Sequence, residues 1–119
     1  MPAPVEWIRT VCLGFPGATE HVQWGNHLVL KVEAKIFAVA SLEPSPLWLS
    51  LKVTPDQFAE LTEQPGIIQA PYFARTKWVA LEQDCTMGRN ELKTWLRGSY
   101  DLVVAGLPKK ARLKLQGAS

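Results

Sequence analysis

Apolar and polar residues alternate along the middle of the chain. Segment 47–53 places an aliphatic residue at every odd position and a polar or aromatic one at every even position: Leu47, Leu49, Leu51 and Val53 against Trp48, Ser50 and Lys52. A period of two residues is typical of a β-strand with one buried face. We therefore expect the three leucines to face the core and the residues at 48, 50 and 52 to face away from it.

The same period, or a short apolar run, predicts further strands at 20–24, 27–33, 36–42 and 77–82. In the last of these, one face carries Lys77, Val79 and Leu81 and the other carries Trp78, Ala80 and Glu82. Short connections between successive strands predict antiparallel hairpins. The connection around residues 33–34 lacks the Gly or Asn that a two-residue turn prefers, so its geometry stays open.

Three segments show helical spacing or helix boundary signals. Segment 4–13 repeats apolar residues three and four positions apart. Segment 54–64 begins with a capping box, because Thr54 can cap the helix and Gln57 follows three residues later. The third helix is predicted over 89–105, where a glycine and then a proline end it.

The order of these elements predicts an α+β fold with two layers. It consists of an antiparallel sheet of about five strands with the helices packed on one face. We expect one domain over residues 1–106 and a basic C-terminal tail over 107–119, with irregular chain from the second helix to about residue 76.

Composition supports a soluble globular protein, with 47% apolar and 20% charged residues. The uncharged stretches, such as Pro44–Leu51, are too short to span a bilayer, and the first ten residues show no signal-peptide pattern. With only two cysteines, a cytoplasmic chain with reduced thiols is the simplest expectation. The net charge of +2 is uneven, since residues 1–106 carry −2 and the tail carries +4.

Catalytic chemistry is not indicated by any motif. The two histidines, His21 and His27, are far in sequence from the two cysteines, Cys12 and Cys85. A metal site needs several converging ligands, and a nucleophilic pair needs the fold to bring a cysteine to a histidine. Phosphate-binding glycine loops are absent from the sequence. We predict no catalytic residues, no metal and no cofactor, and a protein that is not an enzyme.

Aromatic residues and cations suggest a binding surface instead. If the leucines of segment 47–53 face the core, Trp48, Lys52 and Trp78 share the open face of the sheet, where they could stack exposed bases of a nucleic acid. Alternatively, the two tryptophans cover the sheet or fill an interface with a second copy or with another protein. These alternatives remain open at the level of sequence.

Two further candidate sites have a plain structural alternative. A small-molecule pocket is conceivable around the turn at 24–26, and its candidate residues are Trp24, Asn26, Lys31, Tyr72 and Lys77. Turn chemistry alone also explains a Gly and an Asn at this position. The tail offers four cations for nucleic-acid phosphates, Lys109, Lys110, Arg112 and Lys114. Its alternative is a solvated, fraying end.

Several stretches together resemble the MmcQ/YjbR family. They are "FPGATEHVQWGNHLVLKVEAKIFAVASLE", "LSLKVTPDQFAEL", "GIIQAPYFARTKWVAL" and "ELKTWLRGSYDLVVAGLPKKAR", which cover most of the chain. The sequence departs from the family's pattern at Glu33-Ala34, where the family usually places a glycine in the turn. The resemblance implies a small α+β fold similar to that of the bacterial frataxin homologue. The family is often described as DNA-binding, but the resemblance implies no established biochemical activity.

Iron binding, which a frataxin-like fold would suggest, is disfavoured because the first helix offers only Glu6 as an acid. The sequence thus predicts a small, non-enzymatic, bacterial binding protein. Our first hypothesis is that this protein binds nucleic acid weakly and with little sequence preference. We expect no membrane partner. A homodimeric or protein–protein interaction module is the alternative, and small-molecule binding is the third choice.

Overall fold

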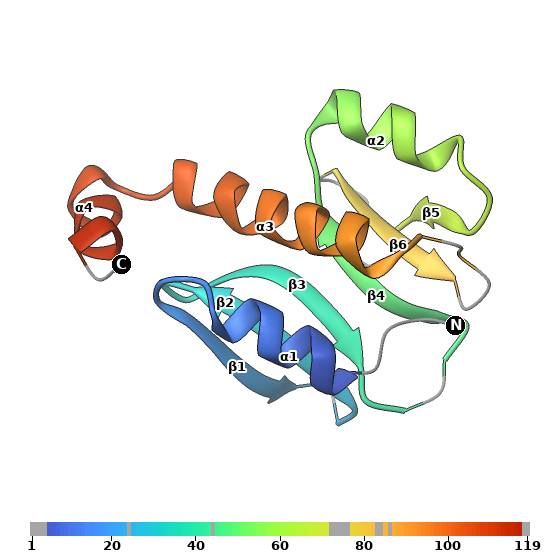
Figure 1. The fold of residues 1–119 in the computed structure, drawn as a ribbon, viewed down its shortest axis with the longest axis horizontal. Coiled ribbons are helices and arrows are strands. Elements are labelled where there is room, and N and C mark those ends of the chain that lie inside the picture. The colour runs from blue at the N-terminus through green and yellow to red at the C-terminus, as the bar shows by residue number, and fades with distance from the viewer. Residues whose placement is uncertain are drawn as a thin grey trace.

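A computed structural model describes residues 5–23, 25–43, 45–71, 77–82, 85 and 87–117 (Figure 1). The elements in chain order are α1 Val5–Leu13, β1 Ala18–Gln23, β2 His27–Val32, β3 Lys35–Ser41, β4 Leu47–Lys52, α2 Pro55–Thr62, β5 Ile67–Gln69, β6 Trp78–Glu82, α3 Arg89–Ala105 and α4 Lys109–Gly117. The predicted α+β class is confirmed, and so are the three predicted helices and the five predicted strands, within a few residues at their ends.

The strands form one six-stranded antiparallel sheet in the order β1-β2-β3-β4-β6-β5. The first four strands follow one another as neighbours because each connection is short. The strand that was not predicted is β5, which lies in the stretch expected to be irregular and pairs along β6. Its pairing of Ile67 with Leu81 extends the sheet and its core by one short strand.

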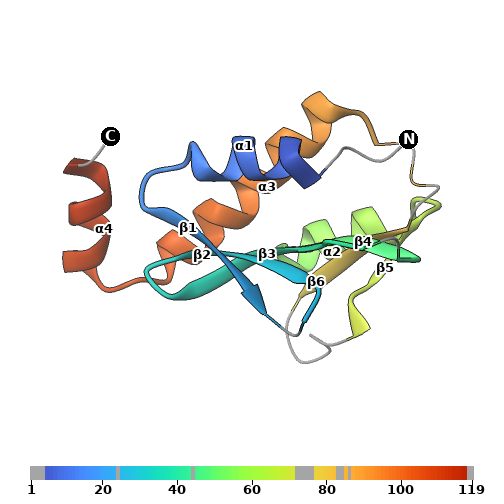
Figure 2. The same cartoon turned by 90° about the horizontal axis from the view of Figure 1, so that it is seen from below.

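Helices α1, α2 and α3 all pack on one face of this sheet, which we call the helix face. Figure 2 shows α1 and α3 on the same side of the strands, and Leu61 of α2 belongs to the same apolar cluster as Leu92 and Leu96 of α3. The predicted capping box of α2 is confirmed, because the Thr54 hydroxyl accepts from the Gln57 amide at 3.1 Å and the Gln57 side chain accepts from the Thr54 amide at 3.0 Å. We call the opposite side of the sheet the open face.

Strand β4 departs from the strict alternation that its sequence suggests. Leu49 and Leu51 lie in the helix-face core as predicted, but the pairing with β6 shifts between Leu47 and Leu49. As a result Trp48 also joins the helix-face core, while Leu47 packs against the cluster on the open face. The predicted orientation is therefore wrong for Leu47 and Trp48, because a β-bulge inserts one extra residue and reverses the faces beyond it.

The two-residue turn between β2 and β3 has the geometry that its sequence left open. Glu33 and Ala34 have φ values of 49° and 64°, so both occupy the left-handed region. That is the arrangement of a type I′ hairpin turn, which normally carries Asn and Gly. The turn thus has a regular backbone shape, but Glu33 and Ala34 are strained in it, because holding a residue with a side chain in the left-handed region costs free energy.

The basic segment at the C-terminus is not a solvated tail. Residues 109–117 form helix α4 beyond the end of α3 (Figure 1). Leu107 and Leu115, on either side of the basic residues, are 7% and 6% exposed and belong to the main core. Leu115 fills the space over Gly17, whose φ of 72° and lack of a Cβ allow that approach. The cations therefore stand on a packed element of the fold.

Candidate functional site

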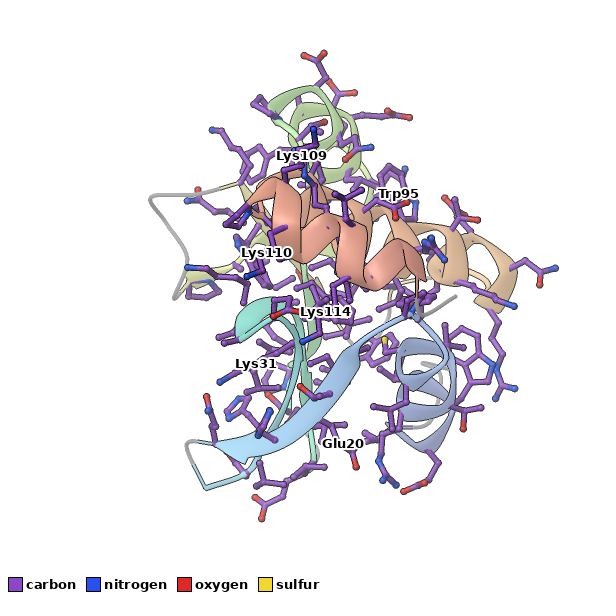
Figure 3. All side chains as sticks on the ribbon, turned by 90° about the vertical axis from the view of Figure 1, so that its left-hand side faces the viewer. Glu20, Lys31, Trp95, Lys109, Lys110 and Lys114 are labelled. Atoms are coloured by element: carbon purple, nitrogen blue, oxygen red, sulfur yellow. The ribbon has the colours of Figure 1, made fainter. Side chains whose placement is uncertain are left out.

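Helix α4 exposes four cations, which are spread around the part of the helix that does not face the body of the protein. At about 100° per residue, Ala111 and Leu115 project toward the body of the protein, and the remaining positions project outward. We call the four exposed cations of this outward side the basic surface: Lys109, Lys110, Arg112 and Lys114. Figure 3 shows Lys109, Lys110 and Lys114 on the exposed side of the helix. Leu113, 54% exposed, is the apolar residue between them.

Nothing within the described part of the chain neutralises the basic surface. The ion pairs found there join Arg9 to Glu6 and to Glu20, and Arg97 to Asp101. Helix α4 carries no acidic residue in its described sequence. The four cations are therefore available to an external anion.

Glu20, on β1, is the acid that Figure 3 labels below α4. Its carboxylate accepts hydrogen bonds from Arg9 at 2.5 and 2.6 Å, and these bonds lower its pKa below the usual range. The carboxylate stays ionised with Arg9 as its partner, which leaves little net charge to oppose the cations of α4. Lys31 lies between Glu20 and the basic surface in this view and adds positive charge at the same end of the molecule.

The predicted stacking platform does not form. Trp78 lies on the open face as expected, but it is only 4% exposed and packs with Val29, Val39 and Ala80. Trp48 lies on the opposite face, is 8% exposed, and donates its indole N–H to the Glu82 carbonyl at 3.1 Å. The two rings belong to different apolar clusters and are both buried, so they form no joint stacking surface, and their burial also removes the exposed apolar patch on which the interaction-module hypothesis relied.

Lys52, the third residue of that platform, is half-buried and pairs across the sheet with Trp78, on the open face as predicted. Its backbone carbonyl accepts a hydrogen bond from the Ser99 hydroxyl at 2.6 Å, which ties β4 to α3. Lys52 lies away from α4 and is not part of the basic surface.

The residues predicted to form a small-molecule pocket do not gather in one place. Trp24 and Tyr72 lie outside the described residues. Lys31 is on the open face beside Val29, whereas Lys77 lies on the helix face with its ammonium 4.7 Å from the centre of the Phe58 ring. Asn26 sits in the turn, with its amide 3.4 Å from the Glu43 carboxylate.

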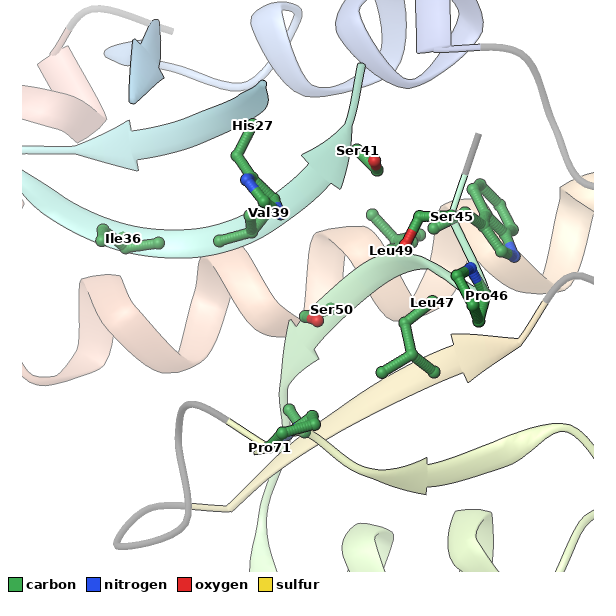
Figure 4. Close-up of a pocket in the computed structure, with 12 residues that line it drawn as sticks. His27, Ile36, Val39, Ser41, Ser45, Pro46, Leu47, Leu49, Ser50 and Pro71 are labelled. Atoms are coloured by element: carbon green, nitrogen blue, oxygen red, sulfur yellow. The ribbon is translucent and has the colours of Figure 1, made fainter. Parts of the chain in front are cut away.

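A cavity of about 770 Å³ instead opens on the sheet, between β3 and β4 (Figure 4). The described residues that line it are His27, Ile36, Val39, Ser41, Ser45, Pro46, Leu47, Trp48, Leu49, Ser50, Ala70 and Pro71. Sequence reasoning missed this cavity. The one available signal was the serines at 41 and 50, which interrupt the apolar character of the two central strands.

The cysteines and histidines are separated by the sheet itself. Cys12 and Cys85 are free and belong to the helix-face core, whereas His27 lines the cavity on the open face and His21 pairs with Val29 on that same face. Burial raises the pKa of the Cys12 thiol to about 12, so this sulfur is a packing group rather than a nucleophile. Among the described residues, no three His, Cys, Asp or Glu side chains are grouped to hold a metal ion.

Comparison with known proteins identifies the family. The sequence model of the YjbR family matches residues 13–102. The chain belongs to the YjbR family. The fold also matches that of the Deinococcus radiodurans protein DR2400, which contains a DUF419 domain, with a TM-score of 0.84 and 31% identity over 97% of this chain and 94% of that one.

A protein from Pseudomonas syringae shares the fold of this YjbR-family protein at 16% identity, with a TM-score of 0.70 over 84% of this chain and 98% of the other. No curated protein matches the chain in sequence. The match to the family ends before α4, so the basic surface is a feature of this chain outside the matched segment. Within the described residues, none of the helices is long and apolar enough to cross a membrane.

Proposed function

We propose that this YjbR-family protein is a non-enzymatic binding protein that holds nucleic acid weakly and with little sequence preference through its basic surface. One observation carries the proposal: α4 presents four exposed cations, and among the described residues neither an acid on the helix nor an ion pair neutralises them. Contacts between such cations and phosphates release condensed counterions and so favour binding. We expect the protein to act in the cytoplasm, where its two free cysteines would stay reduced.

A soluble polyanion suits α4 better than a lipid surface. A helix that lies in a membrane interface inserts a broad apolar side among the lipids. The apolar side of α4, formed by Ala111 and Leu115, is already packed against the body of the protein. What remains outside is cationic apart from Leu113, and such a surface can meet phosphates but has little to bury in lipid.

Contacts to the backbone of the nucleic acid account for the expected lack of sequence preference. Three of the four cations are lysines, whose ammonium groups act as point charges toward phosphate. Reading of bases would need side chains held in a groove or stacked on exposed rings. The buried positions of Trp48 and Trp78 provide no such stacking, so single strands should gain nothing over duplex from these rings.

The test is a fluorescence-anisotropy titration with duplex and single-stranded oligonucleotides at several salt concentrations. Four phosphate contacts imply that the logarithm of the association constant for duplex falls with the logarithm of salt concentration with a slope of about −3.6. Replacing Lys110 and Lys114 together with Gln should reduce the slope to about −1.8 and weaken binding to all sequences alike.

The matched control replaces Lys77 and Lys93 with Gln. This variant changes the net charge by the same amount, and both lysines are exposed and lie away from α4. We expect its salt dependence to equal that of the wild-type protein. If the two double variants behave alike, only overall charge matters and the basic surface is not the site. Absence of binding by the folded wild-type protein at low salt rejects the proposed function.

A further inference from the structure

The cavity on the open face lies over two central strands, β3 and β4, and extends to the point where they separate. Strands β3 and β4 pair at only three positions, and the last of these joins Ala40 to Leu49. Beyond that pair, β3 continues along β2, where Ser41 pairs with His27, while β4 turns toward β6. The cavity of about 770 Å³ covers this divergence together with paired positions such as Val39 and Ser50 (Figure 4).

The bulge in β4 shapes the wall of this cavity. Because the bulge turns the Trp48 ring to the helix face, where the indole is fixed by its bond to the Glu82 carbonyl, the ring does not fill the space between the strands. Leu47 is turned to the open face and forms part of the wall. A regular strand would have placed the large ring on the open side and the leucine in the core.

The lining of the cavity is apolar with a few hydroxyl groups. Aliphatic side chains such as Ile36, Val39 and Leu47 provide its apolar surface. The Ser41 hydroxyl donates to the Glu43 carbonyl at 2.7 Å, so its oxygen lone pairs remain able to accept a hydrogen bond. The half-buried Ser50 hydroxyl forms no hydrogen bond within the described part of the chain, and it can both donate and accept.

The charge of the lining restricts the occupant. None of the described lining residues is an Asp, Glu, Lys or Arg, and the imidazole of His27 is the titratable group among them. An ionised ligand would lose water here without meeting a carboxylate, ammonium or guanidinium group of these described residues, and that loss opposes its binding. An uncharged ligand with an apolar body gains from the aliphatic wall, and its hydrogen-bonding group can meet a hydroxyl. The volume lies within the range of about 300–1,000 Å³ that is usual for small-molecule sites.

We propose that the cavity between β3 and β4 is a binding site for an uncharged small molecule with a largely apolar, ring-sized body and a hydrogen-bonding group that meets Ser50. The site is distinct from the basic surface, because it lies on the open face of the sheet and the basic surface lies on α4. The inference is therefore independent of the proposed nucleic-acid binding, and each can fail without the other.

The experiment uses two matched probes, indole-3-acetamide and indole-3-acetate, which share a ring and differ in charge. Each is titrated to millimolar concentration into ¹⁵N-labelled protein, and amide chemical shifts are followed. We expect the uncharged amide to shift the resonances of Val39, Ser41 and Ser50 in a saturable manner. The anion should bind at least about tenfold more weakly, which corresponds to about 1.4 kcal/mol.

Two substitutions of Ser50 test the place of binding. Ser50→Leu fills part of the cavity and should weaken the binding of indole-3-acetamide at least about tenfold, while Ser50→Ala keeps the space and removes only the hydroxyl, so its effect should be smaller. The control is Thr94→Leu, on an exposed position of α3, which should leave binding unchanged. The spectra themselves report whether each variant is folded.

Three results would overturn the inference. The first is that indole-3-acetamide shifts none of the three amides at millimolar concentration. The second is equal or tighter binding of the anion, which would contradict an uncharged ligand. The third is that folded Ser50→Leu and Ser50→Ala bind the probe as the wild-type protein does, because a ligand in the cavity cannot ignore both changes.

Discussion

The two faces of the sheet are built from the same strands and differ in almost every property. On the helix face, α1, α2 and α3 cover a continuous core, and all but one of the largest fully buried side chains belong to it. The exception is Val29, which lies on the open face in a small cluster around Trp78. That cluster ends at a cavity lined by hydroxyl and aliphatic groups.

The difference shows where the stability of the fold arises. Burying one large aliphatic side chain contributes about 1.5–3 kcal/mol, so a face with many of them can hold the sheet together alone. The other face then has freedom to keep a hollow between two central strands and polar side chains around it. Binding sites commonly occupy parts of a scaffold that its core does not need.

The largest effect that tests this comparison is expected at Trp48. If its ring belongs to the helix face, Trp48→Ala should lower the free energy of unfolding by about 3–5 kcal/mol, because it leaves a large void and removes the bond to the Glu82 carbonyl. Urea denaturation followed by circular dichroism measures the change. A loss below about 1 kcal/mol would indicate that the Trp48 ring is exposed on the open face, as strict alternation predicts.

The next test compares two leucines of the same strand. Leu49 is 1% exposed and lies in the helix-face core, so Leu49→Ala should lower the free energy of unfolding by about 2–5 kcal/mol. Leu47 is half-buried on the open face, so Leu47→Ala should lower the free energy of unfolding by only about 1 kcal/mol. Equal costs in urea denaturation would show that the bulge does not separate the two residues, and the contrast between the faces would lose its clearest example.

The smallest effect is expected at the hairpin turn, where neither face is packed. Ala34 has a φ of 64°, so Ala34→Gly should raise the free energy of unfolding by about 0.5–1 kcal/mol, the relief of left-handed strain less the added entropy of the unfolded chain. The control is Ala59→Gly, on an exposed position of helix α2, which should lower stability by about 1 kcal/mol. Thermal or urea denaturation measures both variants. If the two changes in the free energy of unfolding do not have opposite signs, the turn is not strained.

Much of the fold follows from local patterns in the sequence. The capping box at Thr54 and the glycine after residue 105 set helix boundaries through neighbouring residues, and the period of two sets the strands. These features depend on contacts close along the chain, which a sequence displays directly. The general class and the covered face of the sheet could therefore be predicted.

The missed features depend on contacts between distant residues. The segment 47–53 fits strict alternation, and the bulge is fixed by the Trp48 indole and a carbonyl at Glu82, 34 residues away. Strand β5 is three residues long and acquires its partner only through β6. The cavity is lined by residues far apart in the chain, such as His27, Ser50 and Pro71, so no single strand encodes it.

Helix α4 could have been recognised. Leu107, Ala111 and Leu115 stand four residues apart, and such spacing is a sign of a helix with one apolar side. Four cations in a short segment are also typical of a solvated tail. A helix with cations on one side and small or apolar residues on the other can nevertheless pack against a protein. The candidate cations were found from sequence, whereas their rigid support was not.

The contact between Gly17 and Leu115 ties the first turn of the chain to its last helix. A side chain at position 17 would collide with Leu115, and the φ of 72° would disfavour it as well. A larger residue at position 17 would therefore require both a smaller residue at position 115 and a different backbone conformation. The packing of α4, and with it the placement of its cations, thus depends on a glycine in a turn that itself carries no charge.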